Sequence, residues 1–174
     1  MGWMDDQLFV TDKDQRPSPA LMLSIKNSPH SWVKPLGGLW TSTYTGEETG
    51  SAWVQWCLVE EFNLPKDGWH CYLLKPKKDA NVYVVDSKED LKVLLDRFER
   101  RDFPGLSLMR AIDFEKMALH YNGLHLTRKG EWETRMDIRD NLYGWDVEST
   151  LWFRWVFEEV EDLGIRTFQL KETG

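Results

Sequence analysis

The sequence GGLWTST runs from Gly37 to Thr43, and it decides how we interpret the fold. Aromatic and β-branched residues follow the two glycines, and such a run favours a β-strand. Glycines ahead of a strand allow another backbone or a ligand to approach closely. A tryptophan beside a cluster of hydroxyl groups could stack on a planar ligand and bind its polar edge. The stretch therefore predicts a strand, and it leaves open whether the glycines serve a β-turn or a ligand.

Short strands and helices are indicated on both sides of this stretch. Ser51 is placed to cap a helix over residues 52–62, whose apolar residues recur at helical spacing. Ser87 opens a capping box for a second helix, Asp113 caps a short third one, and Lys129-Gly130 reads as a turn. Helices do not follow every strand, so we expect an α+β fold rather than a regular parallel sheet. The expected strands are Ala20–Ile25, Trp69–Leu74, Val82–Val85, Leu124–Thr127 and Val147–Val156.

Length and composition exclude several classes of protein. The chain has 174 residues, which suits one domain, with Lys+Arg 22 and Asp+Glu 29 for a net charge of −7. This acidic balance argues against general binding of duplex DNA. No apolar run approaches the ~20 residues of a membrane span, and the N-terminus lacks a signal-peptide pattern. Two cysteines, Cys57 and Cys71, are too few for a disulfide scaffold. We expect a soluble cytoplasmic domain that does not bind membranes.

Glu148 is the strongest candidate for a catalytic carboxylate. It lies near Val147 and Leu151 on a segment that we expect to be a strand, which would partly desolvate it. Such a carboxylate can stabilise a developing cation or accept a proton. The alternative is a solvated strand position, because glutamate is usually exposed. No metal site is expected, since the histidines lack metal-ligand spacing; they are His30, His70, His120 and His125.

Three of these segments, taken in order, resemble the ADP-ribosyltransferase fold, in particular the clade of poly(ADP-ribose) polymerases and diphtheria toxin. In that clade a Gly-x-Gly-aliphatic-Tyr-aromatic strand precedes a Ser-Ala helix, and a late strand carries a glutamate followed by alternating apolar residues. Gly37, Leu39 and Trp40 would occupy the first pattern, Ser51-Ala52 the second and Glu148 the third. The intervening segment YLLKPKKDANVYVVDSKEDLKVLL is similar to an insertion of many bacterial and phage members.

A second alignment equates Thr41-Ser42-Thr43 with the Ser-Thr-Ser strand of the arginine-modifying clade, and it also keeps Glu148. The resemblance implies an α+β domain with a split β-sheet core and two or three helices. It covers residues 20–157 of a single domain 1–174. A polar N-terminal segment, 1–19, and a C-terminal extension, 158–174, would flank this core.

The resemblance also implies a function, which is transfer of ADP-ribose from NAD to a macromolecular acceptor, either protein or nucleic acid. Glu148 would then be the catalytic residue. Within the cofactor pocket, the candidates for NAD contacts are Gly37, Gly38, Trp40 and Ser42. The family's first strand carries a His or Arg that binds the ribose of NAD, and Ala20–Ile25 has neither. Ser24 or His30 would take over this contact.

Two other functions remain open at this point. A catalytically inactive domain of the same fold could bind a protein or nucleotide partner. An unrelated tryptophan-rich module could instead bind sugars or peptides through exposed aromatic rings. The chain has 10 tryptophans, and exposure of several of them on one face would favour the module.

Overall fold

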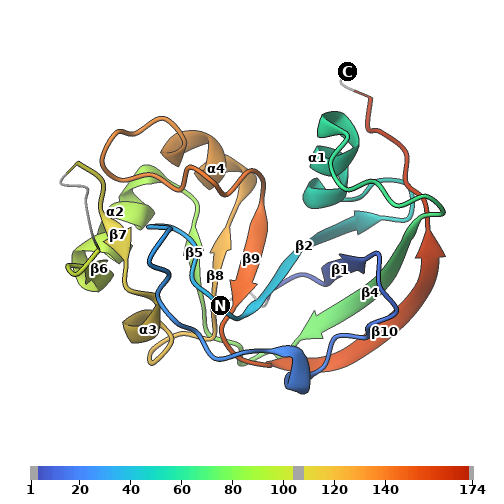
Figure 1. Cartoon of the computed structure of the whole chain (residues 1–174), viewed down its shortest axis with the longest axis horizontal. Helices are drawn as coiled ribbons and strands as arrows, with labels where there is room; N and C mark the ends of the chain where they lie inside the picture. The colour runs from blue at the N-terminus through green and yellow to red at the C-terminus, as the bar shows by residue number, and fades with distance from the viewer. Residues whose placement is uncertain (1–3, 104–107, 173–174) are drawn as a thin grey trace.

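A mixed eight-stranded β-sheet organises the chain, with four helices packed around it (Figure 1). The computed structural model describes residues 4–103 and 108–172. Seven strands follow the order β10-β4-β1-β2-β9-β8-β5, and β3 pairs with β2. Among the described strands, only β5 and β8 pair in parallel. The strands are β1 Gln7–Thr11, β2 Leu39–Gly46, β3 Gly50–Ser51, β4 Trp69–Pro76, β5 Val82–Val85, β8 Gly123–Leu126, β9 Ser149–Trp152 and β10 Phe157–Arg166.

Strand β2 belongs to both halves of this sheet. Its first residues pair with β9, through Leu39↔Trp152 to Thr41↔Thr150. Its middle residues pair with β1, through Leu8↔Ser42 and Gln7↔Thr43. The pairing with β9 therefore ends at the residue before the pairing with β1 begins. The sheet splits at this point.

The helices divide between the two halves. Helix α1, Ala52–Glu60, covers the half that contains β1 and β4, while the other three lie on the side of β5 and β8 (Figure 1). Burial of Val54 and Cys57 against Leu8, Trp69 and Cys71 fixes α1 on its half. Apolar burial is the main driving force for such packing. The remaining helices are α2 Lys88–Phe98, α3 Phe114–Met117 and α4 Arg128–Thr134, and a two-stranded sheet, β6 Glu99–Arg100 with β7 Ala111–Ile112, adjoins α2.

The sequence predicted the helix starts because capping is local. The side chains of Ser51 and Ser87 accept hydrogen bonds from the third residue of α1 and α2, at 3.2 Å and 3.1 Å. Asp113 caps α3 in the same way. These contacts satisfy main-chain N–H groups that have no partner within a helix. The mixed sheet and the helices around it confirm the α+β class.

The expected number of helices, two or three, is wrong for the described chain, which has four. The segment Lys129-Gly130 is not a turn but part of α4, which Thr127 caps. A Cβ atom at position 130 would collide with the carbonyl of Val85, so glycine lets α4 pack directly on the end of β5. The glycine that suggested a turn serves this close approach instead.

The strand expected at Ala20–Ile25 is also wrong. Only a short 3-10 turn, Pro19–Leu21, forms there, and Lys26 pairs with Leu36 in an isolated bridge. The strand next to β2 is β1, from the segment that we expected to be a polar N-terminal extension. β10 lies within the expected C-terminal extension and pairs with β4. Both segments contribute strands to the same sheet as the expected core.

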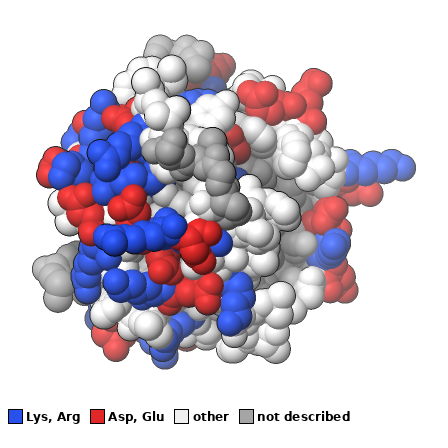
Figure 2. All heavy atoms as spheres, turned by 60° about the vertical axis from the view of Figure 1, so that its left-hand side comes forward, with Lys and Arg blue, Asp and Glu red and all other residues white. Residues whose placement is uncertain are grey.

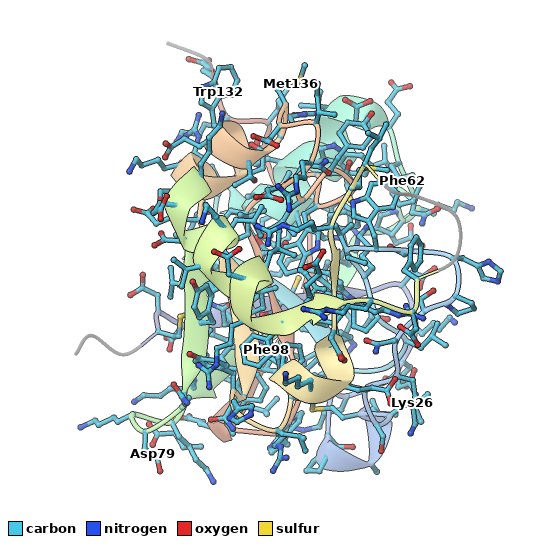
Figure 3. All side chains as sticks on the ribbon, turned by 90° about the vertical axis from the view of Figure 1, so that its left-hand side faces the viewer. Lys26, Phe62, Asp79, Phe98, Trp132 and Met136 are labelled. Atoms are coloured by element: carbon cyan, nitrogen blue, oxygen red, sulfur yellow. The ribbon has the colours of Figure 1, made fainter. Side chains whose placement is uncertain are left out.

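The side view of the helical half shows α2 lying across the sheet (Figure 3). Phe98, at the end of α2, is 1% exposed and packs in the core beneath the helix. Trp132, on α4, and Met136, two residues after its end, project outward at the opposite end of this view (Figure 3). Among the described residues, the structure contains no helix with the length and apolar character needed to cross a membrane.

Candidate functional site

Glu148 lies at the split of the sheet, one residue before β9. Its Oε1 atom accepts hydrogen bonds from the Ser42 hydroxyl at 2.8 Å and from the Thr43 main-chain N–H at 3.0 Å. Its Oε2 atom accepts a third from the Thr43 hydroxyl at 2.7 Å. The side chain is only 12% exposed. The carboxylate is thus fixed and largely desolvated rather than solvated on a strand.

The split explains why a carboxylate fits at this position. β9 stops pairing with β2 at Thr41, so the N–H of Thr43 has no strand neighbour on that side. The carboxylate of Glu148 accepts this N–H in place of a main-chain carbonyl. Buried N–H groups are nearly always paired, so the site needs an acceptor here. Glu148 therefore has a structural role at this position, and any catalytic role comes in addition to it.

Helix α1 begins beside the hydroxyl of Ser42. The main-chain N–H of Trp53 donates to the Ser42 hydroxyl at 3.4 Å, and that hydroxyl donates to Glu148. The N-terminus of a helix carries a partial positive charge, which favours a nearby anion. Ser42 therefore links Glu148 to the start of α1. It holds the carboxylate, a contact that the sequence did not predict.

A chain of buried polar groups supports the site from behind. Trp152 donates its indole N–H to the Thr41 hydroxyl at 2.8 Å, which donates to the Gln7 side chain at 2.7 Å. The amide of Gln7 then donates to the Thr43 hydroxyl at 3.3 Å. Gln7 and Trp152 are fully buried. Because each of these groups has a partner, the hydroxyl that holds Glu148 is itself held in place.

His125 joins the site from β8, and the sequence gave no reason to select it. It pairs with Thr150 across β8 and β9, and its Nδ1 atom lies 2.7 Å from the Thr150 hydroxyl. The same nitrogen is 3.6 Å from Oε2 of Glu148. Burial lowers the pKa of His125, and the carboxylate of Glu148 opposes this shift. The alternation of side chains along a strand predicts only that His125 lies on one face of β8. That β9, and with it Glu148, lies beside β8 follows from the sheet pairing.

Trp40 is half-buried, and its ring is partly occupied by protein contacts. It packs edge-to-face against Trp145, with ring centroids 4.7 Å apart. The Lys34 ammonium lies 5.7 Å from the centre of the ring. Trp40 and Ser42 are two residues apart on β2, so their side chains share a face of the sheet. The ring is therefore on the same face of β2 as Ser42, and it packs against the core.

Gly37 and Gly38 serve contacts within the chain. Both have positive φ angles, 83° and 76°. A Cβ atom at Gly38 would lie 2.7 Å from the carbonyl oxygen of Trp152, and one at Gly37 would lie 2.8 Å from that of Leu23. The close approach predicted for these glycines exists, and the approaching group is the chain's own backbone.

Ser24 and His30 are exposed and lie in irregular segments before β2. No hydrogen bond within the described chain joins either side chain to Glu148, Ser42 or Thr43. The strand that was expected to carry a ribose contact does not form, so these two residues lose the basis of their assignment. The structure does not bring them together with Glu148.

The tryptophans of the described chain do not form an exposed face. Trp132 is 78% exposed, whereas Trp69, Trp145 and Trp152 are at most 7% exposed. Trp53 stacks on Trp56 with ring centroids 5.1 Å apart. The excess of tryptophan therefore serves packing for the most part, and it does not favour a tryptophan-rich binding module.

Two cavities lie away from Glu148. One of about 870 Å³ adjoins α2 and α3 and is lined by residues such as Arg97, Asp113 and Lys116. Another of about 340 Å³ lies beside β6 and β7. Neither is lined by Glu148 or Ser42. Acidic and basic side chains alternate over this face of the molecule (Figure 2), so it presents no uniformly basic surface.

Metal ligands do not cluster anywhere in the described part of the chain. No protein-family model, curated protein or solved structure matches the sequence or the fold. The residues of the site therefore carry the functional argument by themselves.

Proposed function

We propose that this chain transfers ADP-ribose from NAD to a macromolecular acceptor, protein or nucleic acid, with Glu148 as the catalytic carboxylate. The observation that supports this function is the fixed carboxylate at the split of the sheet, held by Ser42 and Thr43. Cleavage of the nicotinamide–ribose bond leaves positive charge on the ribose. A desolvated carboxylate that is already oriented stabilises such charge without further rearrangement.

The groups around Glu148 fit a cationic centre. The N–H and O–H donors of Ser42 and Thr43 all point at the carboxylate, so it is held as an acceptor. Trp40 lies on the same side of β2 as Ser42 and would stack on nicotinamide with the part of its ring not covered by Trp145. The backbone of Gly37 and Gly38 would contact the nicotinamide part of NAD. NAD is a substrate in this scheme.

An inactive domain that binds a protein or nucleotide is the second candidate. Two observations favour it: the cavities do not reach Glu148, and the side chains of Ser24 and His30 do not contact it. In this case Glu148 would serve only to pair the polar groups at the split.

Incubation of the protein with NAD labelled on the adenylate tests the proposal. We expect label transfer or nicotinamide release by the wild type, and a loss of at least roughly 100-fold in Glu148→Gln. Gln can still accept from the N–H of Thr43, so the variant should fold, which circular dichroism would verify. Glu158→Gln is the control, because Glu158 pairs with Lys75 on the surface.

Three results would contradict all or part of this proposal. Equal cleavage of NAD by the wild type and Glu148→Gln would remove Glu148 from the chemistry. Absence of cleavage, combined with a shift in the melting temperature on addition of NAD, would favour the inactive binding domain. Absence of both at millimolar NAD would remove NAD from the function altogether.

A further inference from the structure

We propose that His125 is the general base that accepts a proton from the acceptor group in this site. This inference rests on the proposed transferase function, and it adds a residue and a proton transfer to it. It stands on three observations: the neighbours of Nδ1, the accessibility of Nε2, and the hydrogen bonds that already occupy the oxygens of Glu148.

The neighbours of Nδ1 determine which nitrogen carries the proton. Nδ1 lies 2.7 Å from the hydroxyl oxygen of Thr150 and 3.6 Å from Oε2 of Glu148. An unprotonated Nδ1 would direct its lone pair toward the carboxylate, which is electrostatically unfavourable. A protonated Nδ1 directs its N–H toward both oxygens. The tautomer with the proton on Nδ1 is therefore favoured, and the lone pair is left on Nε2.

The second nitrogen is available to a substrate. The hydrogen bond with the Thr150 hydroxyl engages Nδ1, and the ring also interacts with the main chain of Ser149, in the strand beside it. Nε2 does not belong to the buried polar atoms, among the described residues, that lack a partner. With the side chain 12% exposed, solvent reaches the ring at this nitrogen. We therefore expect the lone pair of Nε2 to be open to a substrate, while Nδ1 is the nitrogen that lies near the carboxylate.

The charged groups around His125 suit a base. Glu148 before β9, Asp5 before β1 and Asp86 after β5 all favour the protonated ring, and Lys129 lies 3.7 Å from Asp86. Burial favours the neutral ring and is the larger effect, so the pKa of His125 is lowered. The ring is consequently neutral at physiological pH, as a base must be. Once protonated, it is stabilised by the three acids.

Glu148 is less suited to this role, because its oxygens already accept four hydrogen bonds from Ser42 and Thr43. The two residues would divide the work. As the acceptor oxygen or nitrogen bonds to the anomeric carbon, its proton passes to Nε2. The bond from that carbon to the nicotinamide nitrogen breaks, and its electron pair leaves with neutral nicotinamide. The positive charge of the nicotinamide ring is thereby replaced by that of the imidazolium.

Nitrogen NMR of the imidazole tests the geometry without any need for activity. In the folded wild type we expect an unprotonated Nε2 and a protonated Nδ1 for His125. In Glu148→Gln, we expect the pKa of His125 to fall, because the carboxylate that favours the charged ring is gone. A proton on Nε2 at neutral pH, or an unchanged pKa in Glu148→Gln, would overturn the proposal.

The pH dependence of transfer tests the role itself. The wild-type kcat/KM should rise with pH through the pKa of His125 measured by NMR. His125→Asn keeps a donor near Thr150 but has no counterpart of Nε2, so it should lose this rise along with roughly 100-fold in rate. His120→Asn is the control, since His120 is exposed on another part of the surface.

The outcomes separate the two proposals. If the wild type transfers ADP-ribose and His125→Asn keeps the same pH dependence, His125 is not the base and the transferase stands. If the wild type does not cleave NAD, the proposed function and the role of His125 both fall. A His125→Asn variant that unfolds would be replaced by His125→Gln, which must also lose the rise with pH.

Discussion

The carboxylate of Glu148 accepts the main-chain N–H of Thr43 across 3.0 Å, at the point where β9 stops pairing with β2. A side chain thus takes the place of a strand in the hydrogen bonding of the sheet. The same side chain is the candidate catalytic group. Stability and chemistry are therefore coupled at one residue, and variants must separate them.

Truncation of Glu148 should destabilise the fold far more than its neutralisation. Glu148→Ala leaves the N–H and the hydroxyl of Thr43 without their acceptor, which should cost about 3 kcal/mol in the free energy of unfolding. The Ser42 hydroxyl keeps the main-chain carbonyl of residue 148 as its acceptor. Glu148→Gln retains an acceptor and should cost about 1 kcal/mol. Urea unfolding measures both, with Glu158→Ala expected to lie within about 0.5 kcal/mol of the wild type. Equal losses for Ala and Gln would show that charge, rather than pairing, stabilises the split.

Gly38 and Gly164 offer a matched pair, because both have a φ angle of 76°. A Cβ atom at Gly38 meets the Trp152 carbonyl at 2.7 Å, whereas at Gly164 the space is empty within 4 Å. Gly164→Ala should cost only the strain of the backbone, about 1 kcal/mol. Gly38→Ala should cost roughly 3 kcal/mol, because backbone must also move. Similar melting temperatures for the two variants would mean that position 38 has room, and a ligand contact there would gain support.

The lowered pKa of His125 predicts a loss of stability in mild acid. Burial disfavours the charged ring in the folded state, so the folded pKa lies below the ordinary value of 6.5. As the pH falls through 6.5, the unfolded chain takes up this proton first, and the free energy of unfolding decreases until the folded pKa is reached. Well above 6.5 the residue contributes no pH dependence.

His125→Asn should flatten this dependence in urea unfolding between about pH 7 and pH 5. Carboxylates with lowered pKa values do not obscure the result. Asp162, for example, is held by His70, and it affects stability only as the pH falls below about 4. An unchanged slope in His125→Asn would assign the mild-acid loss to another group.

The two cysteines should be inert in the folded protein. Cys57 and Cys71 are both free and buried, at 2% and 0% exposed. Burial raises the pKa of each thiol to about 11. The thiolate is the reactive form, so a disulfide reagent at about pH 8 should modify the native protein at least roughly 100-fold more slowly than the urea-unfolded chain. Rapid modification of the native protein would show that the core around α1 opens.

The sequence predicted those features that depend on neighbouring residues. Ser51 and Ser87 cap helices because a cap involves residues only three positions away. Strand β1 was missed although Leu8, Phe9 and Val10 form a short apolar run, because polar and acidic residues lie on both sides of it. Its first residue, Gln7, is buried through hydrogen bonds with Thr41 and Thr43 that only the sheet creates.

The candidate site was predicted only in part, because its contacts join residues that are far apart in the sequence. Glu148 and Ser42 were both selected, but their contact spans 106 positions and follows from the pairing of β2 with β9. His125 enters through β8, which pairs with β9 on the other side. Strand order is a property of the whole sheet, and short patterns do not encode it.

Ser42→Ala should weaken catalysis while leaving the fold largely intact. The hydroxyl of Ser42 is the only side-chain donor to Oε1 of Glu148 within the described chain, but the N–H of Thr43 still reaches that oxygen. We therefore expect a carboxylate that is paired but less well oriented, with kcat for NAD cleavage reduced roughly 10-fold and KM little changed. Ser149→Ala is the control, because the hydroxyl of Ser149 donates only to the carbonyl of Val147. A rise in KM at constant kcat in Ser42→Ala would instead assign Ser42 to binding of NAD, as the sequence first suggested.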